Sequence, residues 1–243
     1  TPTLSSAASD VYKRQIITRI YCLVMEHQVL EFFPQVCGVY QYPLEKINDI
    51  KLVCEKIRET IKPGDQNYNQ NALCGDLFHY YNSSNTNIYD YHPELEEHRK
   101  WVIECATHFF TKVHNYVLTE ENELLITDAW MNYCLERAQQ SEHNHHNSLI
   151  SGTYYVNMVD WVHAPIQFMK RDPECHPYIA HAKDWDSPNK YSRYVEDIRP
   201  KEGDLLLWKS HLIHGYQGNL NMWADRTSIS VSYTHLTLPT TMW

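Results

Sequence analysis

The sequence predicts an α+β domain in which helices support a closed β structure. Two patterns indicate this: residues 43–118 contain two stretches with apolar residues at helical spacing, and residues 124–230 contain short β-type runs separated by polar turns. The chain is also long enough, because 243 residues of which 43% are hydrophobic can build one domain with a sizeable core. Helices grouped before strands favour a β part that closes as a barrel or a sandwich.

The front half begins with a strand expected within residues 28–42, where aromatic and β-branched residues gather. A helix follows and is ended by Pro63-Gly64. Its apolar positions at helical spacing are Ile47, Ile50, Val53, Cys54 and Ile57. Residues 65–92 are rich in Asn and Tyr, show no clear period and are expected to form a loop with short pieces of structure.

A second, longer amphipathic helix is expected from about Pro93 to residue 118. Its apolar stripe consists of Trp101, Cys105, Phe109, Val113 and Val117. We expect this helix to support the β part and to carry no chemistry.

The back half contains five β-type runs, at residues 124–136, 148–159, 164–169, 204–210 and 226–230. Between two of them, residues 171–200 are long, polar and charged. A long ordered loop in a compact domain is often a lid or a binding loop. A plain insertion explains the segment equally well, so both interpretations stay open.

Both ends of the chain resemble translated sequencing-library adapters. The stretch DVYKRQ near the start resembles the translation of a transposase end sequence, and VSYTHL near the end resembles the translation of its reverse complement. We therefore interpret residues 1–15 and 231–243 as artificial tails and exclude them from the fold argument. A single domain is expected over residues 16–230, with helical support at about 43–118 and the β core at about 124–230.

Composition excludes several classes of function. A formal net charge of −9 and a pI near 5.9 argue against nucleic acid as a partner. The seven cysteines are odd in number, scattered and without a CxxC pair, which argues against a disulfide scaffold and a thiolate zinc site. No apolar run could span a bilayer and no secretory segment opens the chain, so we expect a cytoplasmic protein with no membrane partner.

Histidines provide the first chemical signal. His143 and His145 are separated by one residue, so on an extended segment both imidazoles would leave the same face and could hold a divalent metal side by side. An HxH pair alone is weak evidence, because His-rich patches are often solvated loops. A second segment, from Glu202 to Gly215, leads a buried strand into a turn that delivers His211 and His214. A third ligand from a distant strand is what an open metal site needs.

Arg226 and Ser228 provide the other signal. An arginine opens the last β run, and a hydroxyl follows two residues later on the same face. The guanidinium group binds a carboxylate with two parallel hydrogen bonds, and the hydroxyl can add another donor.

In combination these segments resemble the 2-oxoglutarate and Fe(II)-dependent oxygenase superfamily, and within it a small group found in phages, bacteria and environmental sequence sets. The resemblance covers roughly residues 28–230 and is strong from Trp130 onward. Its motifs appear in order as Trp130-Met131-Asn132, His143 to Tyr155, Glu202 to Gly215 and Arg226 to Ser228. It implies a double-stranded β-helix, a cupin-like jelly roll. It also implies a dioxygenase that uses Fe(II), 2-oxoglutarate and O2 to hydroxylate a substrate, with release of succinate and CO2.

The resemblance also implies roles for single residues. His143 and His214 would be iron ligands, and Arg226 with Ser228 would bind the distal carboxylate of 2-oxoglutarate. Tyr155 and Asn132 would face the cosubstrate.

The sequence departs from the superfamily pattern at His145, where the usual triad carries a carboxylate. Either His145 is the third ligand, or it lies behind the site and a carboxylate such as Glu142, or a water, completes the sphere. His146 would point to the opposite face of a regular strand.

The remaining histidines and Trp208 are expected to have no role in the chemistry. We expect His211 to face outward, Trp208 to be a core residue, and His163, His176 and His181 to lie on the surface. A different class of protein also fits three histidines in a β-barrel, namely a cupin-type metal-binding protein or isomerase without 2-oxoglutarate. Arg226 and Ser228 are the features that such a protein does not need. The primary substrate cannot be inferred from the sequence.

Overall fold

The computed structural model describes residues 30–31, 33–61, 68–70, 77–119, 122–170, 190–191, 193–216, 221–222 and 224–237. The chain divides into two units, residues 1–35 and residues 36–243, and the second contains every helix and strand described below. In the described part of the chain, no helix is long and apolar enough to cross a membrane.

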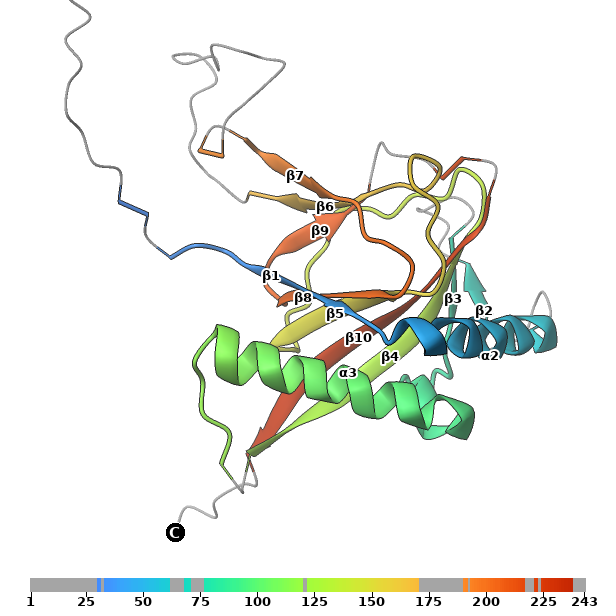
Figure 1. Ribbon diagram of the computed structural model, residues 1–243, viewed down its shortest axis with the longest axis horizontal. Helices are drawn as coiled ribbons and strands as arrows, with labels where there is room; N and C mark the ends of the chain where they lie inside the picture. Colours follow the sequence, from blue (N-terminus) through green and yellow to red (C-terminus); the bar gives the residue numbers. More distant parts are fainter. Residues whose placement is uncertain are drawn as a thin grey trace, which may run out of the picture. The chain divides into compact units, whose positions relative to one another are not determined.

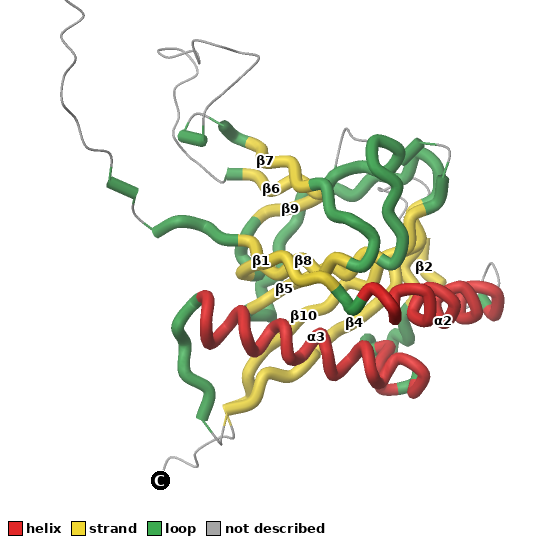
Figure 2. Tube along the Cα trace, in the orientation of Figure 1, coloured by secondary structure: helices red, strands yellow, loops and turns green. Residues whose placement is uncertain are grey.

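Two antiparallel sheets form the β part (Figures 1 and 2). The larger has seven strands in the order β1 (Cys37–Gln41), β8 (Asp204–Lys209), β5 (Ile150–Tyr155), β10 (Arg226–Thr237), β4 (Asn122–Cys134), β3 (Leu77–Tyr80) and β2 (Tyr68–Gln70). The smaller has three, in the order β7 (Val195–Ile198), β6 (Ile166–Met169) and β9 (Ile213–Gly215). The architecture is α+β with a jelly-roll β part, as predicted.

Each face of the large sheet is covered. Helices α2 (Ile47–Thr60) and α3 (Glu96–His108) lie along one face, and their buried residues share one core with Tyr154 and Ile229 of the sheet (Figure 2). On the other face, Tyr155, Leu206 and Trp208 pack against Ile166 of the small sheet. Successive side chains of a strand point to opposite faces, so neighbouring residues of β5 enter different cores.

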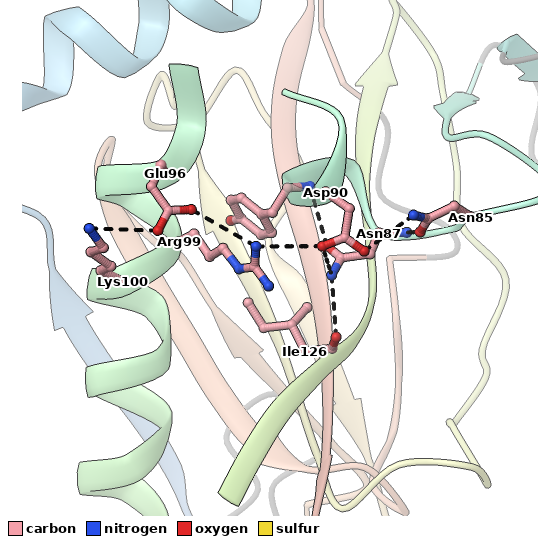
Figure 3. Close-up of polar contacts among 8 residues, drawn as sticks. Asn85, Asn87, Asp90, Glu96, Arg99, Lys100 and Ile126 are labelled. Atoms are coloured by element: carbon pink, nitrogen blue, oxygen red, sulfur yellow. Dashed lines mark hydrogen bonds and ion pairs between the residues drawn. The ribbon is translucent and has the colours of Figure 1, made fainter. Parts of the chain in front are cut away.

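A short connection ties the helical layer to the sheet (Figure 3). In the 3-10 helix η2 (Ile88–Asp90), the Asp90 carboxylate lies 3.5 Å from the Arg99 guanidinium of α3. The Asn87 side chain, which precedes η2, donates a hydrogen bond to the Ile126 carbonyl of β4 at 3.3 Å. The 3-10 helices η1 (Leu44–Lys46) and η3 (Pro93–Leu95) lead into α2 and α3. These contacts keep the helical layer in place on the sheet that carries the site.

The second helix differs from its sequence pattern at its end. After His108 the chain forms a π-helical turn, η4 (Phe109–Val113), so residues four apart no longer lie on one stripe. Phe109 is buried, but Val113 is 46% exposed and Val117 is 80% exposed. The predicted stripe is therefore correct only as far as Phe109.

The last strand crosses the expected domain boundary. We excluded residues 231–243, yet β10 continues to Thr237 and pairs with β4 along that length. Val231 and Tyr233 are buried in the core on the helix face. The strand is therefore longer than the run at 226–230 that the sequence indicated, because Val231 and Tyr233 continue the burial of Ile229 on the helix face. That residues 231–243 are an artificial tail stays a prediction.

Candidate active site

Three histidines converge at one end of the small sheet. His214 lies on β9, and its backbone exchanges two hydrogen bonds of 2.9 Å with His143. The backbone amide of His145 donates to the Ser210 carbonyl at 3.0 Å. The three imidazoles each offer a nitrogen within 4.8 Å of the others, as a shared metal requires.

Hydrogen bonds select the tautomer of two of these rings. Nδ1 of His143 lies 2.8 Å from the Ser141 carbonyl, and Nδ1 of His214 lies 3.0 Å from the Leu212 carbonyl. A carbonyl only accepts, so each Nδ1 carries the proton and donates it. Nε2 of both rings is therefore left with a lone pair for a metal ion.

Electrostatics keeps the three rings neutral. Burial lowers the pKa of His214 to about 3 and that of His145 to about 4, and each is lowered further by His143. Burial also lowers the pKa of His143. Neutral imidazole is the form that binds metals, so the site needs no proton release near pH 7.

Arg226 lies on β10, facing the same cavity, and is 3% exposed. Its Nη1 donates to the Ala164 carbonyl at 2.7 Å, and its Nη2 donates to Sγ of Cys134 at 3.6 Å. Burial opposes the charge, but Cys134, Tyr216 and Tyr155 raise the pKa of the guanidinium above its ordinary value. Among the described residues no carboxylate pairs with it, and its buried Nε has no hydrogen-bond partner. A buried cation of this kind favours an anionic ligand.

A polar network surrounds Asn132 in the same cavity. Asn132 of β4 donates to Ser230 at 2.8 Å and to Ser228 at 3.4 Å. Its carbonyl oxygen lies 2.7 Å from Nδ1 of His79 and accepts from Trp130 at 3.0 Å. Because both ends of the amide are engaged, its orientation is fixed.

The structure places all seven predicted site residues around a single cavity. They are Asn132, His143, His145, Tyr155, His214, Arg226 and Ser228. His146 and Glu142 are exposed and do not join the group of converging ligand atoms, which favours His145 over either of them as third ligand. His211 is exposed, as expected. Trp208 is buried, as expected, but it also lines the cavity, with its ring 4.7 Å from that of His214.

The expectation for His163 is wrong. The residue is 2% exposed, and its Nδ1 accepts the Val159 amide at 3.1 Å. The ring of His163 is buried because it bonds to the backbone of its own turn, and the polar character of a histidine gave no sign of this. His176 and His181 lie outside the described residues, as does most of the 171–200 segment, within which β7 spans Val195–Ile198.

Several residues of the cavity were not assigned to the site from the sequence, and Tyr216 and Ser230 are two of them. The Tyr216 ring lies 4.5 Å from the Arg226 guanidinium carbon. Ser230 could have been found by continuing the alternation of Arg226 and Ser228 by two residues. Tyr216 follows His214 by two residues, so the same alternation would have indicated it as well.

Comparison with known proteins agrees with this geometry. Residues 128–232 match the family described as "Putative 2OG-Fe(II) oxygenase". The match covers less than half of the 243-residue chain. As the description of that family says, its members are oxygenases that use Fe(II) and 2-oxoglutarate. No curated protein is significantly similar in sequence.

Solved structures share the fold of this chain at low identity. AviO1 from Streptomyces viridochromogenes Tue57 is 15% identical with a TM-score of 0.55, covering 96% of both chains. A prolyl hydroxylase from Trichoplax adhaerens, in complex with a hypoxia inducible factor peptide, is 12% identical with a TM-score of 0.53, covering 96% of this chain and 94% of its own. HygX from Streptomyces hygroscopicus, with nickel and 2-oxoglutarate bound, is 10% identical with a TM-score of 0.52, covering 86% and 84%.

The residues of the cavity fit both cofactors. Three neutral imidazoles are a donor set suited to a divalent transition metal. The buried guanidinium without a carboxylate partner matches the charge of a 2-oxo dicarboxylic acid.

Proposed function

We propose that the protein is an Fe(II)- and 2-oxoglutarate-dependent dioxygenase that hydroxylates a still unidentified substrate. The observation that carries the proposal is the pairing, in one cavity, of three convergent histidines with a buried arginine that no described carboxylate neutralises. A cupin-type metal protein needs the first feature and not the second.

In this proposal His143, His145 and His214 hold the iron. Iron bound there supplies the activation of O2 for attack on an unreactive C–H bond, with 2-oxoglutarate converted to succinate and CO2. Three neutral ligands leave the site more positive by one charge than two histidines and a carboxylate would, which favours an anionic cosubstrate.

The other residues bind and orient the cosubstrate. Arg226 pairs with its distal carboxylate, and Ser228 donates a further hydrogen bond to the same group. Asn132 holds Ser228 and Ser230 in place. Tyr155 and Trp208, both buried, exclude water from the interior side of the cavity.

Anaerobic titration tests the assignment. Addition of 2-oxoglutarate to the Fe(II)-loaded protein should produce the weak visible charge-transfer band of a chelated iron complex. Arg226→Gln should weaken 2-oxoglutarate binding by about tenfold or more, because a charged hydrogen-bonded pair is lost. Lys100→Gln, a change on the exposed outer side of α3, should leave the titration unchanged. An iron-loaded, folded protein without the band would contradict the proposal and favour a cupin-type protein.

A further inference from the structure

A second cavity of about 470 Å³ lies beside the metal site, and His145 lines both. Its volume falls within the range of about 300–1,000 Å³ that is typical of small-molecule sites. The described residues that line it come from η4 and the segment after it, from the segment between His145 and the start of β5, and from the end of β8. Those that the argument uses are Phe110, His114, Tyr116, His145, Leu149 and Lys209. A molecule in this cavity would lie against the imidazole that we assign to the metal.

The wall formed by the segment after α3 is flat and aromatic. The rings of His114 and Tyr116 are stacked, with centroids 5.8 Å apart and planes 18° from parallel. The Phe110 ring lies 4.8 Å from that of Tyr116. Leu149, across the cavity, is 38% exposed, so apolar surface continues to the rim. Surfaces of this kind bind flat apolar groups.

The cavity has one cation and no acidic lining among the described residues. Nζ of Lys209 donates to the Tyr116 hydroxyl at 3.0 Å and lies 5.2 Å from the centre of that ring. No ion pair joins Lys209 to a described Asp or Glu, although the chain as a whole carries a net charge of −9. An ammonium group positioned by a neutral partner in the wall of a largely apolar pocket selects an anionic ligand.

We propose that this cavity binds the primary substrate and that the substrate is a flat, largely apolar carboxylate whose anionic group pairs with Lys209. The proposal rests on the dioxygenase function proposed above, because His145 would be the ligand that brings the metal next to the substrate. The aromatic wall of Phe110, His114 and Tyr116 would hold the body of the molecule.

Binding of two matched probes, 1-naphthoate and the neutral 1-naphthalenemethanol, tests the pocket by calorimetry. Measured with saturating 2-oxoglutarate, the naphthoate should bind the more tightly, and Lys209→Gln should weaken it by about tenfold or more while leaving the alcohol unchanged. Lys209→Arg should retain the preference for the anion, and Lys100→Gln should resemble wild type. Equal affinity of the two probes, or an unchanged naphthoate affinity in Lys209→Gln, would overturn the proposal. Displacement of naphthoate by 2-oxoglutarate would also overturn it, because the probe would then occupy the Arg226 cavity.

Proximity to the metal is tested separately by proton relaxation of bound naphthoate. Mn(II)-loaded protein should broaden the naphthoate resonances strongly, and Zn(II)-loaded protein should not. Bound naphthoate without broadening in Mn(II)-loaded protein would refute the pocket as the substrate site. If the histidines bind neither Mn(II) nor Fe(II), the proposed dioxygenase function fails, while the Lys209 comparison still decides which ligand the pocket selects.

Discussion

On one face of the seven-stranded sheet the Tyr154 ring packs between Tyr42 and His98, and on the other face the Tyr155 ring lies 5.8 Å from the Arg226 guanidinium carbon. Each face carries tyrosines and histidines that are almost completely buried. The helix face is a core, whereas the cavity face is the candidate active site.

Burial alone does not distinguish these two faces. The pKa of His98 and the pKa of His214 are each lowered by burial to about 3. What differs is the arrangement: Nδ1 of His98 lies 2.9 Å from the Tyr89 hydroxyl among packed aromatic rings, while His214 meets two other imidazoles. Convergence of groups with matching chemistry therefore indicates a site better than a shifted pKa does.

The largest expected effect separates the histidines of the two faces. His214→Ala should lower the affinity for Fe(II) or Zn(II) by more than about a hundredfold, since loss of a ligand costs more than loss of an outer partner. His98→Leu should keep metal affinity close to wild type. Metal titration followed by calorimetry measures both, and an equal loss in the two variants would contradict the distinction between the faces.

A buried histidine on the helix face, His98, should make the free energy of unfolding depend on pH. Because the folded state depresses the pKa of His98, the unfolded chain binds the extra proton below pH 6.5, and stability falls as the pH falls toward about 3. Between pH 6.5 and pH 5 this single group should cost the wild type about 1.5 kcal/mol, which His98→Leu should not lose.

Urea unfolding at the two pH values provides the measurement for His98. Other buried histidines contribute to the same window, so the readout is the difference in pH dependence between wild type and variant. A variant with the full wild-type pH dependence would show that His98 is not the group responsible.

Adding a methyl group at Gly152 tests how closely the side chains on the helix face are packed. A Cβ added at Gly152 would lie 2.5 Å from Cδ2 of Leu207 and 2.8 Å from the backbone oxygen of Leu206. Gly152→Ala should therefore lower the free energy of unfolding by about 1–3 kcal/mol. Thermal unfolding checks this, with Ser141→Ala at an exposed position as control.

The smallest effect concerns two adjacent tyrosines. Tyr155→Phe should raise the Kd for 2-oxoglutarate by less than about tenfold, because one hydroxyl near the Arg226 cavity is lost. Tyr154→Phe should leave that Kd unchanged and should not lower stability, because the buried Tyr154 hydroxyl has no hydrogen-bond partner. A larger effect of Tyr154→Phe on cosubstrate binding would reverse the assignment of the faces.

The sequence predicted the fold class and the seven site residues that the structure places around one cavity. It could do so because their pattern is local. Alternation and ordered motifs place Arg226 and Ser228 on one face of a strand, and the structure agrees. His143 reaches this point from an isolated bridge, and His145 reaches it from an irregular segment just before a turn, so neither lies on a regular strand. Their metal-binding role stays a prediction.

The rest depended on tertiary contacts that no local pattern encodes. Tyr154 and Tyr155 point to opposite faces of β5, yet both are buried, because the helices cover the second face of the sheet as well. The contact between the Tyr216 ring and the Arg226 guanidinium is a tertiary one. The π-helical turn at Phe109 breaks the four-residue spacing of the apolar positions, and no Gly or Pro indicates it in the sequence.

The position of β10 has a consequence for how the protein folds. It follows every other described strand in the sequence, yet it lies between β5 and β4 in the sheet. Until it inserts, the strands on either side of it form two separate groups with unpaired edges, which are prone to aggregate. Pairings of such long sequence separation slow folding, since the loop entropy is lost before the contacts form. The guanidinium of Arg226 arrives on this same strand, so completion of the sheet and assembly of the anion-binding half of the cavity are one event.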